Sequence, residues 1–368
     1  MDNGPGTPPS GIVVGMKRTP ALRLRPGTPV LTRGGGQVQC GSDPRWSFVL
    51  SGLAPAEESW LEEIAERRHV TIEQSAARCG VPAERRDEIM AALSRAGVLV
   101  PVPGAVGTVT APADGAADAT ALGMLRPDGA GLATLAERAG RVVGVVGLGR
   151  LGTAVALHLA TAGVGGLVLC DPLPVQTTDV GLGGLRAADV GEARDLAVQA
   201  LLAERSPRVG VRVDDVGGGA GLDPAALDVV VVTEPHAAHP ARYQRLLGLG
   251  VPHLPVVVRE ADVVVGPLVR PGRSACVSCV DLAHADADRE WPALAAQLRK
   301  TPEPTHEATL AAVAAATAAG QVLAQLDGHR PAAVGACLEI SLPAGIPRAR
   351  PAEPHPRCGC VVLPVRAA

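Results

Sequence analysis

The sequence predicts an α/β protein in which a small α+β domain precedes a larger domain with a mostly parallel sheet. Residues 141–165 read as a buried strand, a turn with three glycines and a helix, and a second strand then ends at Asp171. Residues 228–233 form a continuous apolar run of the kind buried in parallel sheets. Before residue 100, three short extended pieces precede three helical segments. The order strand, glycine turn, helix and strand indicates a Rossmann-like βαβ unit.

Length and composition are those of a multidomain globular chain. Its 368 residues suggest two or three domains, and 47% hydrophobic with only 1% aromatic residues means that small aliphatic side chains build the cores. A net charge of −3 provides no long-range attraction for a polyanion, which argues against a nucleic-acid partner. The N-terminus lacks signal-peptide features, and no apolar run approaches the roughly 18 residues of a membrane span. We therefore expect a cytoplasmic protein without a membrane partner.

Four regions are expected along the chain. Residues 1–20 are rich in Gly, Pro and polar residues, which predicts disorder. Residues 21–100 form the small domain, and 101–121 have the Pro, Gly, Ala and Asp content of a linker. Residues 122–368 then form the α/β domain.

The small domain reads as a β-meander followed by three helices. The expected strands are 29–31, 37–40 and 46–50, and the expected helices are 55–68, 72–79 and 83–96, with Thr71 capping the second. The last two helices could also form a DNA-binding helix-turn-helix. However, residues 1–100 contain 12 Lys and Arg against 11 Asp and Glu, which is not the basic surface of a phosphate-binding domain.

The α/β domain continues with alternating helices and strands after Asp171. We expect helices at 190–203, 281–298 and 307–326, strands at 209–213, 255–258 and 263–269, and an edge strand at 338–342.

The glycine turn is the first chemical signal. It contains Gly147, Gly149 and Gly152, and Asp171 follows roughly 20 residues on. Such a turn lets the backbone approach a phosphate at a helix N-terminus, and the carboxylate can bond a ribose hydroxyl. The sequence therefore predicts a nucleotide site. An NAD-linked oxidoreductase would share this turn, but no group of residues suited to hydride transfer accompanies it.

Two close cysteine pairs are the second chemical signal. Cys276 and Cys279 follow a Pro-Gly turn, and Cys358 and Cys360 lie near the C-terminus. In a reducing compartment such pairs are more often metal ligands than disulfides, and a structural Zn²⁺ takes four thiolates in a tetrahedron. We expect a structural zinc that fastens the C-terminal residues to the domain. The alternative is that all four are ordinary small residues.

These features together resemble a known superfamily. The run from Val142 to Asp171, its LATAGVGGLVLCD segment and the later cysteine pairs are similar to the ThiF type of the ubiquitin-activating-enzyme-like superfamily, over residues 122–362. The resemblance implies ATP-dependent adenylation of the C-terminus of a peptide or small protein, together with a structural zinc. Family analogy also favours a homodimer.

A narrower resemblance lies around the first cysteine pair. Residues 266–282, GPLVRPGRSACVSCVDL, with Asp288 and the Trp291-Pro292 pair after them, are similar to ThiF-like proteins of thiazole/oxazole-modified peptide biosynthesis. Those proteins stand beside, or are fused to, a YcaO-type cyclodehydratase. Their N-terminal domain is a peptide-recognition element of winged-helix type, and residues 21–99 have its order of strands and helices.

The sequence departs from the pattern of active adenylating members. Leu173 stands where they carry a second Asp, and residues 179–182 stand where they carry Asn-Leu-x-Arg. Arg194 replaces their lysine, and Glu234, with one residue of slippage, replaces their magnesium-binding Asp. Fewer cations at the α-phosphate would cost transition-state stabilisation, although Arg186 and Arg194 could substitute and Glu234 could hold Mg²⁺.

The expected function is therefore recognition. The small domain would bind the leader of a ribosomally made precursor peptide, and the degenerate ThiF-like domain would present it to a YcaO-type cyclodehydratase. Residues 46–50 are the expected receiving strand, with Arg85 and Arg86 available to acidic leader residues. The alternative is an active adenylyltransferase that uses ATP and Mg²⁺. Its cofactor-binding residues would be Gly147, Gly149, Gly152, Asp171, Arg194 and Glu234.

Overall fold

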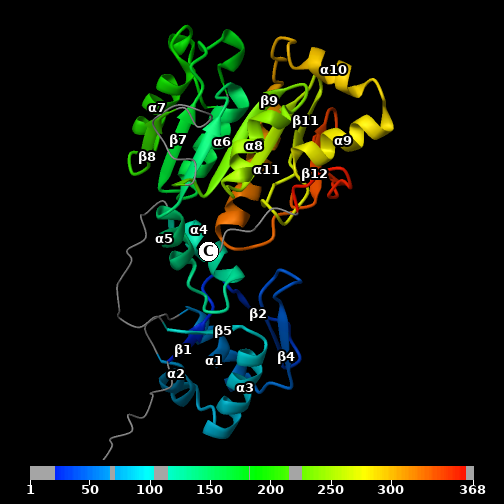
Figure 1. The fold of residues 1–368 in the computed structure, drawn as a ribbon. Helices are drawn as coiled ribbons and strands as arrows, with labels where there is room; N and C mark the ends of the chain where they lie inside the picture. Colours follow the sequence, from blue (N-terminus) through cyan, green and yellow to red (C-terminus); the bar gives the residue numbers. More distant parts are fainter. Residues whose placement is uncertain (1–20, 67–70, 103–114, 182, 215–225, 362–368) are drawn as a thin grey trace, which may run out of the picture. The chain divides into compact units, whose positions relative to one another are not determined.

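The computed structural model describes residues 21–66, 71–102, 115–181, 183–214 and 226–361. The disorder expected for residues 1–20 lies outside this part of the chain. The chain divides into two compact units (Figure 1). The first consists of Met1–Pro112 and Ala116–Leu132, and the second of Ala113–Gly115 and Ala133–Ala368.

The first unit contains a three-stranded antiparallel sheet in the order β2-β3-β4, a separate antiparallel pair, β1 and β5, three helices that follow the sheet, and the later helix α4 (Ala116–Leu125). Trp60, Leu61, Leu93 and Val38 are fully buried in a core between the sheet and the helices. The three-stranded meander and the three helices after it follow the expected order, whereas the β1–β5 pair was not predicted. The elements are β1 (Leu22–Leu24), β2 (Val30–Thr32), β3 (Gln37–Cys40), β4 (Phe48–Ser51), α1 (Pro55–Glu66), α2 (Ile72–Cys79), α3 (Ala83–Arg95) and β5 (Leu99–Pro101).

Helix α2 has both of its ends fixed by local chemistry. The Thr71 hydroxyl accepts a hydrogen bond from the Gln74 N–H at 3.2 Å, and the Gln74 side chain accepts one from the Thr71 N–H at 3.4 Å. This reciprocal pair satisfies two N–H groups that a helix start leaves free. Gly80 ends the helix with a φ of 74°, which glycine adopts at little cost. The expected cap at Thr71 is confirmed.

The second unit is built on an eight-stranded sheet in the order β13-β12-β11-β10-β9-β6-β7-β8. The five strands from β8 to β10 are parallel, and β11, β12 and β13 are antiparallel. The expected mostly parallel α/β fold is thus confirmed. The strands are β6 (Val142–Val146), β7 (Gly166–Cys170), β8 (Gly210–Val213), β9 (Val229–Pro235), β10 (His253–Val258), β11 (Asp262–Val265), β12 (Ala336–Ser341) and β13 (Arg348–Pro351).

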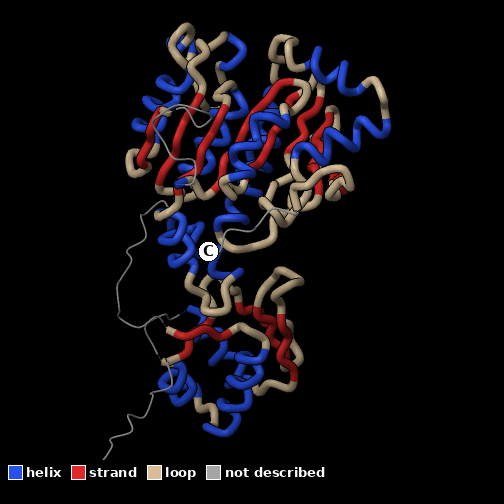
Figure 2. Tube along the Cα trace, in the orientation of Figure 1, coloured by secondary structure: helices blue, strands red, loops and turns tan. Residues whose placement is uncertain are grey.

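Helices cover both faces of this sheet (Figure 2). On one face, α6, α7 and α11 pack over alternate strand residues such as Val145 and Val231; on the other, α8 and α9 pack over Val230 and Val232. The strand order reverses between β6 and β9, and ligands of open α/β sheets bind at such a point, outside the carboxyl ends of the strands. The helices are α6 (Arg150–Thr161), α7 (Arg194–Arg205), α8 (Pro240–Gly248), α9 (Val277–Ala287), α10 (Trp291–Leu298) and α11 (Ala308–Leu326).

The expected linker at 101–121 is partly helical. Residues 103–114 lie outside the described part of the chain, but Ala116–Leu125 form helix α4, and α5 (Gly131–Ala139) follows it. Within the first unit, Arg25 holds α4 by donating a hydrogen bond to the carbonyl of Gly123 at 2.7 Å. The Pro and Gly content of the whole segment obscured an Ala- and Leu-rich stretch that favours a helix.

Several expected elements of the second unit differ in the structure, and the strand expected over 263–269, for example, ends at Val265 as β11. Helix α7 begins at Arg194 instead of 190, because Gly191 has a φ of 97° and ends a turn there. The helix expected over 281–298 is two helices in the structure. Helix α9 ends before Asp288, whose backbone is extended, and α10 begins at Trp291 with Pro292 in its first turn. Strand β12 is an inner strand, because the unforeseen strand β13 pairs with its outer side.

Among the described helices, α11 is the one that is long and apolar enough to cross a membrane. Its buried side consists of small residues packed against α6, with Ala311, Ala314, Ala315 and Ala318 fully buried. In this fold the helix therefore serves as a core element of the α/β unit.

Candidate functional site

The glycine turn connects β6 to α6 at the point where the strand order reverses. Gly147 has a φ of 82°, and a Cβ added to it would lie 2.1 Å from the Thr233 hydroxyl oxygen of β9. A Cβ on Gly152 would lie 1.9 Å from the Gly147 carbonyl oxygen. These two positions therefore require glycine for close packing of strand, turn and helix. At Gly149 the nearest atoms to such a Cβ are carboxylate oxygens of Asp179 and Glu303, both at 3.3 Å.

Asp171 lies at the end of β7 beside this turn and is buried. Its carboxylate accepts hydrogen bonds from the backbone N–H of Leu148 at 2.7 Å and of Leu173 at 3.2 Å. The carboxylate is thus held against the turn, which is the placement expected for a ribose-binding group.

Arg194 is the centre of a buried charge cluster beside the turn. Its guanidinium binds Asp179 in a bidentate pair, at 2.8 and 3.0 Å, and also contacts Asp171 at 3.3 Å and Glu303 at 3.2 Å. The Arg194 side chain is only 5% exposed. Burial acts to lower the pKa of Arg194, but the bond to Asp179 and the neighbouring carboxylates outweigh it and raise that pKa. One cation therefore faces three carboxylates beside the glycine turn.

A segment that we call the strap, residues 301–307, brings Glu303 to this cluster. It is held by Arg194 through Glu303, by Arg150, which donates to the His306 carbonyl at 2.8 Å, and by His236, whose Nε2 lies 3.0 Å from the Pro302 carbonyl. Partial burial and the charges of neighbouring carboxylates raise the pKa of Glu303 against the opposing effect of Arg194. The strap thus places a carboxylate over Gly149.

Glu303 was not identified from the sequence. It stands between Pro302 and Pro304 in a loop with no periodicity, and nothing in that pattern links it to a turn more than 150 residues earlier. By contrast, the sequence does draw attention to Arg194 and Asp179 of the same cluster, because each replaces a residue of the adenylating pattern. Their charges are opposite, and they pair with each other.

Two residues expected at the site lie elsewhere. Glu234 points to the face opposite its neighbour Thr233, as successive strand residues do, and accepts a hydrogen bond from the Tyr243 hydroxyl of α8 at 2.6 Å. Burial raises the pKa of Glu234 despite that bond. Arg186 is 56% exposed and pairs with Asp189 and Glu204 instead of with the cluster around Arg194.

The four cysteines come together at the start of α9. Cys276 is the residue before the helix, and its Sγ lies 3.8 Å from that of Cys279 and 3.6 Å from that of Cys358, while Cys279 and Cys360 are 3.4 Å apart. All four sulfur atoms lie within 4.8 Å of one another. Burial raises the pKa of Cys276 to about 11, so an ion would be needed to hold it as a thiolate at neutral pH. Such a cluster can hold a metal ion.

In the first unit, β4 forms one edge of the β2-β3-β4 sheet. Trp46 just before it and Val49 within it are 41% and 38% exposed. The opposite edge, β2, lies beside α1, where Thr32 bonds to Glu62. Among the described residues, β4 therefore presents the more open edge.

The arginines of α3 are already paired. Arg85 bonds to Glu57 at 2.8 Å and Glu88 at 2.6 Å, and Arg86 binds Asp87 at 2.7 Å. Their charges are therefore neutralised within the unit, which weakens the expectation that they meet acidic leader residues.

Comparison with known proteins gives one family and several structures of the same fold. The model of the ThiF family matches residues 131–360. The structure of E. coli MccB with ATP has a TM-score of 0.67 at 17% sequence identity and covers 92% of this chain and 99% of MccB. MccB with AMPCPP and MccA gives 0.69 at 16%, again covering 92% and 99%. The structure of PaaA gives 0.67 at 16%, covering 89% of this chain and 98% of PaaA. A search of curated proteins gives no significant match.

Proposed function

Because the chain belongs to the ThiF family, we propose that it is a recognition protein of ribosomal peptide modification whose adenylation site has degenerated. In this proposal the first unit, a winged-helix-like domain, binds the leader of a precursor peptide. The ThiF-like unit then presents the precursor to a YcaO-type cyclodehydratase. We extend the proposal to a homodimer, by analogy with the family.

The single observation that carries this proposal is that the Arg194 guanidinium is already paired with carboxylates of the protein. Adenylation concentrates negative charge at an α-phosphate, which must meet unengaged cations or a metal ion. Here Arg194 is buried and binds Asp171, Asp179 and Glu303, and the Glu303 carboxylate already lies over Gly149. A triphosphate entering this cluster would meet a net negative charge.

Leader binding is proposed at the edge of β4. The unpaired backbone groups of an edge strand can accept another strand, and exposed side chains beside it supply apolar contact. Trp46 and Val49 offer such contact, with the guanidinium of Arg45 lying over the Trp46 ring at 5.9 Å. MccB, which has a similar fold, has been crystallised with MccA, and this supports a peptide-type partner for the present chain.

Zinc is the metal proposed for the cysteine cluster. Four sulfur ligands in a closed, largely buried site suit structural Zn²⁺, whose tetrahedral bonds of about 2.3 Å place sulfur atoms at separations like those observed. Bound there, the ion would supply folding energy by joining the C-terminal residues to the start of α9, with Cys276, Cys279, Cys358 and Cys360 as its ligands.

The leader proposal is tested by fluorescence anisotropy with the full chain and a labelled precursor peptide from the same genomic locus. We expect submicromolar affinity for the leader segment and none for the core segment. Val49→Asp should weaken leader binding about tenfold or more, because it places a charge in an apolar contact. Leu31→Asp, at a similarly exposed apolar position on β2, is the matched control and should change affinity little. Equal losses in both variants would contradict a site on β4.

An active adenylyltransferase is the second candidate, favoured by the intact packing of Gly147 and Gly152 and by the ATP complex of MccB. ATP–pyrophosphate exchange separates the two functions. The recognition proposal predicts no exchange by the full chain with any peptide C-terminus. Exchange that depends on the peptide and disappears in Asp171→Ala and Arg194→Ala variants would establish the enzyme instead.

A further inference from the structure

The strap, residues 301–307, lies over the glycine turn and is held there by polar contacts. Arg194 of α7 binds the Glu303 carboxylate at 3.2 Å, and Arg150 of α6 donates to the His306 carbonyl at 2.8 Å. The strap sequence, TPEPTHE, contains no large apolar side chain that would anchor it in a core. Because segments with few buried apolar contacts open at low cost, the strap is able to leave the turn while the rest of the unit stays folded.

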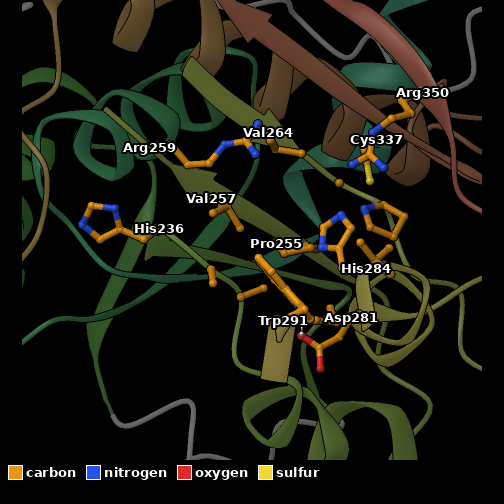
Figure 3. Close-up of a pocket in the computed structure, with 16 residues that line it drawn as sticks. His236, Pro255, Val257, Arg259, Val264, Asp281, His284, Trp291, Cys337 and Arg350 are labelled. Atoms are coloured by element: carbon orange, nitrogen blue, oxygen red, sulfur yellow. Dashed lines mark hydrogen bonds between the residues drawn. The ribbon is translucent and has the colours of Figure 1, made fainter. Parts of the chain in front are cut away.

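His236, directly after β9, holds the strap at a third point. Its Nε2 lies 3.0 Å from the Pro302 carbonyl oxygen, and its φ of 56° is the one positive value at a non-glycine residue in the described part of the chain. Figure 3 shows the His236 ring at the rim of a small pocket, pointing away from Pro255 and Trp291. Strained conformations persist where surrounding contacts enforce them, and they cluster at ligand clamps and switch regions. The strain thus marks the place where the strap meets the sheet.

The His306 side chain is buried in the closed strap although it is polar. Only 7% of the side chain is exposed, and among the described residues neither ring nitrogen has a hydrogen-bond partner. A buried polar group without a partner loses the hydrogen bonds that water would provide. The closed strap therefore carries an unfavourable desolvation of this imidazole, which opening would relieve.

Four charged groups from three elements and the strap itself face His306. They are Asp179 of the loop after β7, Arg150 of α6, Arg194 of α7, and Glu303, whose Oε1 lies 3.6 Å from the His306 Nε2. Burial lowers the pKa of His306 to about 4; the charge of Asp179 opposes this, and those of Arg150 and Arg194 add to it. At neutral pH the closed strap therefore holds a neutral imidazole, whereas a hydrated ring in an open strap takes up a proton near pH 6.5.

We propose that the strap is a proton-operated gate on the glycine turn, closed while His306 is neutral and opened when its ring takes up a proton. Opening carries the Glu303 carboxylate away from Gly149 and gives a nucleotide phosphate access to the turn. Because the open form binds the His306 proton more tightly, the ratio of open to closed forms rises as the pH falls, about fourfold from pH 8 to pH 6. The gate requires neither adenylation nor leader binding at β4, so pyrophosphate exchange and leader affinity do not test it.

Calorimetric titration of the full chain with AMP at pH 8 and pH 6 measures access to the turn. The comparison is with His306→Gln, which cannot take up the proton. The ratio of the two affinities at each pH cancels the titration of the AMP phosphate and of Glu303, which both proteins share. We expect the ratio of wild-type to variant affinity to rise about fourfold from pH 8 to pH 6, since affinity follows the open fraction. His158→Gln, at an exposed imidazole of α6, should follow the wild type.

Trypsin cleavage after Lys300, directly before the strap, reports opening without a nucleotide. The ratio of wild-type to His306→Gln cleavage rates should rise by the same factor, and His236→Ala, which loses one attachment of the strap, should be cleaved faster at both pH values. Thermal melting and leader anisotropy verify that each variant is folded.

Three results would overturn the proposal. The first is a ratio that stays constant with pH in both measurements. The second is a ratio that falls with pH, because a protonated His306 would then hold the strap closed through Glu303. The third is faster cleavage at pH 6 without any gain in AMP affinity, because the strap would then not control the turn.

Discussion

At the scale of single residues, Glu303 is the side chain that we propose limits binding at the glycine turn. Its carboxylate completes the set of three around Arg194 and lies over Gly149, where a phosphate would otherwise approach the backbone. The turn itself keeps the close packing of a nucleotide site. We therefore attribute the proposed loss of adenylation to side chains from outside the motif, and not to the motif itself.

Glu303→Gln should raise the affinity for AMP about tenfold, because it removes one negative charge and frees part of the Arg194 guanidinium. Calorimetric titration of the wild type and the variant with AMP measures the change. Glu353→Gln is the control, since it removes the same charge from an exposed side chain in the same unit. Unchanged affinity in Glu303→Gln would show that the strap does not limit access to the turn.

Two buried histidines should make stability depend on pH. Burial lowers the pKa of His253 to about 4 against the opposing bond to the Val251 carbonyl, and burial lowers that of His306 to about 4 against the opposing charge of Asp179. The unfolded chain takes up these protons near pH 6.5, so stability is complete above that pH and falls as the pH drops towards 4. Each group contributes a slope of about 1.4 kcal/mol per pH unit within this window.

Urea unfolding at pH 7 and pH 5 measures this dependence. His253→Gln and His306→Gln should each lose less stability between the two pH values than the wild type. His158→Gln changes an exposed imidazole of α6 and should follow the wild type. If the free energy of unfolding changed equally with pH in the wild type and all three variants, His253 and His306 would not be the cause of the pH dependence.

Prediction from sequence succeeded at the residue scale where the cause was local. The glycines of the turn, Asp171 at its strand end and the cap at Thr71 all act within a few residues or across one βαβ unit. Glu303 and the pairing of Glu234 with Tyr243 depend on which segments the fold brings together. A single sequence carries no local signal of such contacts.

At the scale of elements, the short strand β13 and the residues after it are joined to the unit at two places. Strand β13 pairs with β12, and Cys358 and Cys360 reach the start of α9. A strand of four residues whose side chains are all exposed gains little from burial. The cysteine cluster is therefore expected to hold this end of the chain.

Metal analysis of the purified protein should find one zinc per chain. Removing it with a chelator should destabilise the second unit by about 4 kcal/mol when free zinc had exceeded its dissociation constant a thousandfold. Cys358→Ser should lose the metal and show the same destabilisation, whereas Cys79→Ser, at a cysteine of the first unit, should keep it. A full zinc content in Cys358→Ser would exclude the four-cysteine site.

Element prediction was most accurate where capping residues mark an end, as at α2. It failed for α4, because the composition of the long segment 101–121 concealed a short helical stretch within it. It also failed at Asp288, where one extended residue divides a helical pattern into two helices. Strand β13 was not predicted because arginines alternate along it and it lacks the apolar pattern of a strand. It is paired through backbone hydrogen bonds with the edge of β12.

At the scale of the whole molecule, the chain contains separate cores. The first unit has its own cluster around Trp60 and Leu93, while the second has a large cluster between the sheet and α6 and α11 and smaller ones around Tyr243 and the cysteines. The fold class follows from sequence because buried strands and glycine turns are local patterns. The number and order of strands do not, since β6 pairs with β9, and β11 with β12, across long stretches of intervening chain.

Thermal unfolding should therefore show two transitions, because each unit has its own core. Addition of a chelator should lower only the transition of the second unit. Trp60 fluorescence reports the first unit and Trp291 the second, so single-tryptophan variants assign each transition. One transition that shifts as a whole with chelator would show that the two units unfold together.

Arg150 lies inside the glycine motif, between Gly149 and Gly152, yet it holds the strap through the His306 carbonyl and a neighbouring loop through the Val180 carbonyl at 2.7 Å. A residue of the glycine motif thus holds the strap that lies over the motif. Any molecule that reaches the turn must wait for a conformation in which this cover has lifted, and its apparent dissociation constant rises in inverse proportion to the fraction of time spent open. Binding at the turn would then depend on the equilibrium between closed and open strap as well as on the contacts of the ligand.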